Sequence, residues 1–185
     1  MPVVVAPYDA ELFGHWWFEG PTFLDFFIRK CAFDQKVFKL ATPGDYLRDF
    51  PENQLAQPPM CSWGANGYAG VWLDASNDWI YPHLHRCAER MIALARDYPR
   101  AEGVTLRALN QAARELLLAQ SSDWAFIMKT GTMVEYAVKR TKVHVNNCLE
   151  LHRQIVSEKI DEGFLSNLEA TDNIFSEIDY RIFRG

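Results

Sequence analysis

The sequence predicts a mainly α fold, in which a C-terminal helical bundle is preceded by a short α/β segment. Three observations support this class. Apolar residues recur at helical spacing from about residue 78 to the end. A β-branched run and a second segment typical of a strand lie before residue 60, and a Pro- and Asn-containing stretch separates these regions. We therefore divide the chain into residues 1–60 and residues 61–185.

The first region mixes predicted strands with helices. Val3, Val4 and Val5 predict a short buried strand that ends at Pro7. Residues 21–30 predict an amphipathic helix, with aromatics on one side at Phe23, Phe26 and Phe27.

A second strand is predicted at residues 37–40. Thr42 then fits a helix N-cap, because Pro43 would take the first helical position and Asp45 the first turn. Residues 51–59 predict a loop and form the candidate domain boundary.

The second region predicts successive helices packed as a bundle. The first two have apolar stripes at Leu84, Cys87, Ala88, Met91, Leu94 and Ala95, and at Leu106, Leu109, Ala113, Leu116 and Leu117. We expect the longest helix to begin at Thr132, with Glu135 completing a capping box, and to end at Gly163. Ser166 with Glu169 marks one more short helix.

Composition indicates a folded protein and excludes several classes of function. Of 185 residues, 49% are hydrophobic and 23% charged, and the net charge of −5 comes without a basic run, so nucleic acid is not an expected partner. No apolar run approaches the roughly 20 residues that span a bilayer, so we expect no membrane partner.

Cysteine and histidine spacing predicts no metal or other cofactor. Cysteines 31, 61, 87 and 148 contain no C-x-x-C pair, which favours neither a zinc site nor a disulfide framework and fits a cytoplasmic protein. His83 and His85 would point about 200° apart on a helix. The spacing of His144 and His152 is explained by packing or solvent exposure as easily as by metal binding.

Carboxylates, a histidine and aromatics cluster in residues 7–20, directly after the first predicted strand. Asp9 and Glu11 would share a face on an extended backbone. Two interpretations remain from spacing alone: a catalytic carboxylate pair, or a loop carboxylate that caps the next helix.

This stretch resembles the acid/base motif of glycoside hydrolase family 57, and within it the 1,4-alpha-glucan branching enzymes. Further segments match that group in order along nearly the whole chain: Cys61-Ser62-Trp63-Gly64, Val71-Trp72-Leu73, Asn77-Asp78-Trp79-Ile80-Tyr81-Pro82-His83-Leu84-His85, Ser121-Ser122-Asp123-Trp124-Ala125-Phe126, Lys129-Thr130-Gly131-Thr132 and Asp172-Asn173-Ile174-Phe175.

The resemblance implies roles for seven residues. Asp9 aligns with the general acid/base, and Glu11 and His15 become neighbours that hold it or contact sugar hydroxyls. Trp16 would lower the polarity around the acid and contact substrate. Trp63 and Trp72 would line the glucan cleft, although most tryptophans belong to a core. Asp123 would accept a sugar hydroxyl; otherwise it is an ordinary first-turn carboxylate.

The resemblance also implies that residues 1–60 are the last strands and helices of an incomplete (β/α) barrel. The nucleophile of a retaining mechanism would lie in a missing N-terminal barrel segment, which is an expected partner together with the α-glucan substrate. We therefore expect the chain alone to be inactive. The alternatives are a family 57 α-amylase or 4-α-glucanotransferase, and a non-catalytic glucan-binding or scaffold module.

Overall fold

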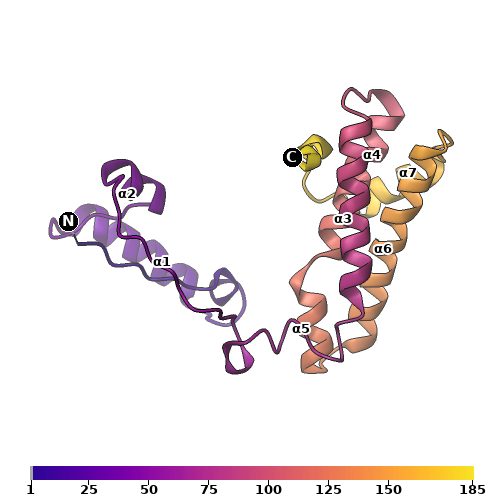
Figure 1. The fold of residues 1–185 in the computed structure, drawn as a ribbon. Coiled ribbons are helices and arrows are strands. Elements are labelled where there is room, and N and C mark those ends of the chain that lie inside the picture. The colour runs from indigo at the N-terminus through magenta and orange to yellow at the C-terminus, as the bar shows by residue number, and fades with distance from the viewer. Residues whose placement is uncertain (1) are drawn as a thin grey trace. The chain divides into compact units, whose positions relative to one another are not determined.

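The computed structural model describes residues 2–185 and contains two compact units, Met1–Pro58 and Pro59–Gly185. The change of unit falls inside the predicted loop. Within residues 2–185 the regular elements are helical and include the α-helices α1 to α7, which can be followed in Figure 1. The mainly α class is therefore confirmed, whereas the assignment of the first unit to a barrel stays a prediction.

The second unit is a helical bundle built from five helices. These are α3 (Ile80–Asp97), α4 (Gly103–Ala119), α5 (Ser122–Thr130), α6 (Val134–Val156) and α7 (Glu162–Thr171). Helix α6 packs against α3, α4 and α5, and α7 packs against α4. The long helices α3, α4 and α6 lie side by side in Figure 1.

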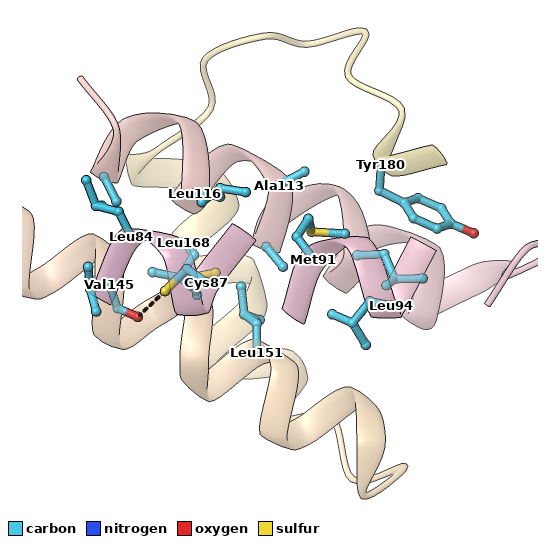
Figure 2. Close-up of a cluster of buried hydrophobic side chains, with 14 of the residues drawn as sticks. Leu84, Cys87, Met91, Leu94, Ala113, Leu116, Val145, Leu151, Leu168 and Tyr180 are labelled. Carbon is cyan, nitrogen blue, oxygen red and sulfur yellow. Dashed lines mark hydrogen bonds between the residues drawn. The ribbon is translucent and has the colours of Figure 1, made fainter. Parts of the chain in front are cut away.

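A continuous apolar core joins these helices, as Figure 2 shows. Met91 of α3 and Leu116 of α4 belong to the predicted stripes and are almost fully buried. Leu151 of α6, which was not predicted, is buried with them. Burial of each such side chain contributes about 1.5–3 kcal/mol. The C-terminal turn Tyr180–Arg184 closes the bundle, because the buried Tyr180 hydroxyl donates to the Tyr98 carbonyl at the end of α3.

The predicted limits of the longest helix are wrong at both ends. Helix α6 begins at Val134 behind Met133, and the Thr132 hydroxyl faces that of Thr130 at 3.5 Å instead of capping the helix. It ends at Val156 because Glu158 takes a positive φ of 56°.

Gly163, the predicted end of the longest helix, lies instead in the first turn of α7. Its N-cap is Asp161, whose side chain accepts from the Phe164 N–H at 3.0 Å. The Asp161 N–H in turn donates to the buried Gln154 side chain at 2.8 Å. The predicted short helix at Ser166 and Glu169 is thus confirmed, with a different cap.

The first unit contains α1 (Gly20–Arg29), a π-helical turn (Lys30–Asp34) and α2 (Pro43–Asp49). The predicted Thr42 cap is confirmed: Thr42 Oγ1 accepts from the Asp45 N–H at 3.1 Å, and Asp45 Oδ2 accepts from the Thr42 N–H at 3.2 Å.

The two predicted strands, residues 3–5 and 37–40, do not form within residues 2–185. A strand requires a neighbouring strand to bond its backbone. The Gln35 side chain bonds the second segment instead, accepting from the N–H groups of Val37 and Phe38. Both predicted strands are largely exposed rather than buried.

No helix described within residues 2–185 combines the length and the apolar composition that crossing a membrane requires.

Candidate functional site

Three aromatic rings from two distant segments meet on the second unit. The Trp63 and Trp72 ring centroids lie 5.8 Å apart, and the Phe126 ring of α5 lies 5.9 Å from Trp63 and 6.4 Å from Trp72. Trp63 is 62% exposed, whereas Trp72 and Phe126 are half-buried. We call these three rings the aromatic surface.

The loop that carries both tryptophans closes on itself. Ser62 donates its N–H to the Gly67 carbonyl at 2.6 Å, and its hydroxyl accepts from the Ala69 N–H at 2.5 Å. Gly64 has φ +76°, and a Cβ there would lie 2.7 Å from Val71 Cγ2, so only glycine fits this close approach. The loop thereby orders two indoles that are partly open to solvent.

Phe126 ends the segment 121–126, but the sequence did not predict it as a site residue. The available signal is its spacing from Asp123, since residues three apart share one face of a helix. Asp123 lies in the first turn of α5, exposed, and accepts from the Ser121 hydroxyl at 3.1 Å. Its interpretation as a sugar-hydroxyl acceptor stays a prediction.

The four remaining predicted residues lie around one short turn of the first unit. Asp9 immediately precedes the 3-10 turn Ala10–Phe13, and its carboxylate makes no capping hydrogen bond there. The alternative of a helix-capping carboxylate is therefore wrong for this turn. Glu11, His15 and Trp16 are exposed like Asp9, with the His15 and Trp16 rings 5.2 Å apart.

Within residues 2–58, the neighbouring aromatic side chains do not bury Asp9 as expected. Trp17 packs on Phe13 and Phe23, with ring centroids 5.6 Å and 4.9 Å away, and Phe18 is 95% exposed. Asp9 therefore faces solvent, where a carboxylate is available to a substrate or to another segment.

A buried polar network within the bundle could be mistaken for a metal site. Ligand atoms of Glu115, His144 and Asp172 lie within 4.8 Å of one another. His144 Nδ1 lies 2.7 Å from Glu115 Oε2, and its Nε2 lies 2.7 Å from Arg140 Nη2. These partners assign the neutral imidazole, with Nδ1–H donating to Glu115 and Nε2 accepting from Arg140.

The rest of this network is also occupied by protein groups. Gln111 Nε2 donates to Glu115 Oε1 at 3.0 Å, and Asn147 Nδ2 donates to Glu115 Oε2 at 3.2 Å. Arg140 Nη2 lies 3.7 Å from Asp172 Oδ1. Burial, then the Glu115 charge, raises the pKa of Asp172. Because a guanidinium already supplies the positive charge, the donor set fits a structural network and we assign no metal.

Comparison with known proteins identifies the family. The model of the family "1,4-alpha-glucan branching enzyme, C-terminal" matches residues 83–183. The chain belongs to this family. Over 181 residues it is 35% identical to the 1,4-alpha-glucan branching enzyme of Thermococcus kodakarensis, covering 95% of this chain and 26% of that enzyme.

Solved structures extend the likeness along the chain. The family 57 branching enzyme of Thermococcus kodakaraensis, crystallised with glucose, has 33% identity and a TM-score of 0.80 over 98% of this chain and 34% of its own. The alpha-amylase AmyC of Thermotoga maritima has 49% identity and a TM-score of 0.71 over 100% and 34%. The chain thus spans between a quarter and about a third of these relatives' lengths.

Proposed function

We propose that this chain is the C-terminal part of a retaining 1,4-alpha-glucan branching enzyme and supplies the acid/base Asp9 together with a glucan-binding surface. The observation that carries the proposal is the aromatic surface, in which Trp63 and Trp72 of the closed loop meet Phe126 of α5 in a member of this family. Flat apolar rings suit the C–H faces of glucose units, and an indole N–H can donate to a hydroxyl.

In the proposed mechanism this chain supplies one of the two catalytic carboxylates. A retaining enzyme places two carboxyl groups about 5–5.5 Å apart, one to protonate the glycosidic oxygen and one to attack the anomeric carbon. The exposed Asp9 would donate and later remove the proton. The nucleophile would belong to the part of the relatives that this chain does not span.

Transfer to a 6-hydroxyl requires that an acceptor chain compete with water. The aromatic surface supports such a role, because it would retain a second glucan chain while the covalent intermediate persists. The α-glucan and the barrel segment are thus the proposed partners. A cytoplasmic location, which the four free cysteines support, stays part of the proposal.

The alternatives are two other catalytic activities and one non-catalytic function. The 49% identity to an alpha-amylase favours hydrolysis, and the same residues would serve a 4-α-glucanotransferase. A non-catalytic glucan-binding module would use the aromatic surface without Asp9.

Calorimetry of the 185-residue chain with maltoheptaose tests the binding half of the proposal. We expect binding that Trp63→Ala weakens, no binding of cellohexaose, and no loss of iodine absorbance when the chain alone is incubated with amylose. Failure of maltoheptaose to bind would contradict the role of the aromatic surface.

Assays of the full-length enzyme on amylose separate the catalytic alternatives. Branching gives new chains that isoamylase releases, with few new reducing ends. An amylase gives new reducing ends without branches. A 4-α-glucanotransferase changes the lengths of linear chains and gives neither new reducing ends nor branches. An enzyme with no turnover that still binds maltoheptaose would favour the binding module.

A further inference from the structure

One buried amide joins the two segments that form the aromatic surface. The Asn77 side chain is fully buried, and its Nδ2 donates to the Val71 carbonyl at 2.9 Å and to the Ala125 carbonyl at 3.1 Å. Its Oδ1 accepts from the Asp74 N–H at 2.9 Å. All three bonds are made to backbone groups.

These backbone groups adjoin the aromatic rings. Val71 precedes Trp72, and Ala125 precedes Phe126, so the two donors of Asn77 hold the residues next to both rings at a fixed separation. An isosteric aspartate has no donor to offer either carbonyl, and alanine leaves both carbonyls buried without this partner.

Further contacts fasten the same loop to the bundle. The Lys129 ammonium of α5 lies 2.6 Å from Asp74 Oδ2 and, with the N–H and hydroxyl of Ser76, lowers the pKa of Asp74 to about 2. The Tyr81 hydroxyl of α3 donates to the Trp72 carbonyl. The loop is therefore tied to both α3 and α5, with Asn77 as its buried connection.

We propose that Asn77 is a positioning residue for glucan binding, which sets the spacing between Trp72 and Phe126 and so keeps the aromatic surface formed before a glucan arrives. This inference rests on the proposed function. Preorganisation favours binding because an ordered loop loses less conformational freedom when it binds. Asn77 itself, being fully buried, would not touch the sugar.

Two measurements on the 185-residue chain test this role. Two indoles at 5.8 Å give an exciton couplet in circular dichroism, which Trp63→Phe should abolish and thereby identify. In Asn77→Ala and Asn77→Asp we expect most of the couplet to disappear and maltoheptaose to bind about tenfold more weakly.

A matched control separates positioning from general loss of stability. Asn110 of α4 also bridges segments, since its Oδ1 accepts from the Tyr180 N–H at 3.0 Å. Tyr180 bonds Tyr98, at the opposite end of α3 from the loop. Asn110→Ala should lower the melting temperature yet keep both the couplet and the affinity.

The outcomes are distinguishable. A couplet and an affinity that both survive in Asn77→Ala overturn the inference, and so does an equal loss of both in Asn110→Ala. If the unmodified chain binds no maltoheptaose, the proposed function fails, while the couplet still decides whether Asn77 spaces the rings. Should the alanine variant not fold, Asn77→Ser, which keeps one donor, is expected to retain part of the couplet; full retention would contradict the inference.

Discussion

The two units of the chain differ in where their aromatic side chains lie. In Pro59–Gly185, Tyr180 and Trp124 are buried, and the aromatic surface gathers Trp63, Trp72 and Phe126 in one place. In residues 2–58 only Gly20 and Cys31 are buried, and rings such as Phe33 remain exposed.

The second unit therefore obtains stability from burial of its own side chains, whereas the first unit exposes many large apolar side chains, a feature typical of surfaces that bind another protein segment. In the proposed enzyme the barrel would cover the first unit, which would also supply the catalytic Asp9, and the second unit would bind the glucan. Four predictions test this division, from the largest effect to the smallest.

Asp9→Asn in the full-length enzyme should lower turnover about 10²–10⁴-fold, because an amide cannot supply the proton in the transition state. Glucan affinity from calorimetry should stay nearly unchanged. Substrates with activated leaving groups should be partly spared in the first step, and Glu11→Gln, equally exposed, should lose less. An equal loss for natural and activated substrates would assign Asp9 a structural role.

Leu116→Ala should lower the free energy of unfolding of the 185-residue chain by about 2–5 kcal/mol, because it opens a cavity at a fully buried position. Phe26→Ala in α1, where the side chain is 66% exposed, should change it by less than about 0.5 kcal/mol. Urea denaturation followed by circular dichroism measures both. Similar losses would show that the first unit is packed as the second is.

Trp63→Ala or Trp72→Ala in the full-length enzyme should weaken glucan binding by about 1–3 kcal/mol, by analogy with base stacking on aromatic rings. Water needs no such platform, so the ratio of hydrolysis to transfer should rise. Trp79→Phe is the matched control, because Trp79 packs against the core outside the aromatic surface. Parallel loss of both rates with lower melting temperatures would make these tryptophans core residues.

The smallest effect concerns pH and the Lys129–Asp74 contact. The folded pKa of Asp74, about 2, lies below its ordinary 3.8, so the contact stabilises the loop fully above 3.8 and is lost as the pH falls toward 2. Tryptophan fluorescence should follow that loss. In Lys129→Met the pH midpoint of the fluorescence change should move toward 3.8. A midpoint equal to that of the unmodified chain would show that Lys129 does not bind this carboxylate.

Local patterns predicted the helices well because their determinants lie within a few residues. The stripe from Leu84 to Ala95 became the buried face of α3, and Thr42 became the predicted N-cap of α2, where it bonds Asp45. Sequence patterns gave wrong predictions where another side chain bonded the backbone of the segment. Gln35 bonded a predicted strand, and Asp161 began a helix two residues before the predicted stop at Gly163.

The sequence alone determined the helical class, the amphipathic faces and the ordered motifs of the family, since each depends on residue type and short spacing. Tertiary packing was needed to show that Phe126 completes the surface of Trp63 and Trp72. It was also needed to show that Asn77 bonds both Val71 and Ala125, the latter 48 residues after Asn77. Such contacts depend on how helices pack through their buried faces, a property that no local spacing encodes.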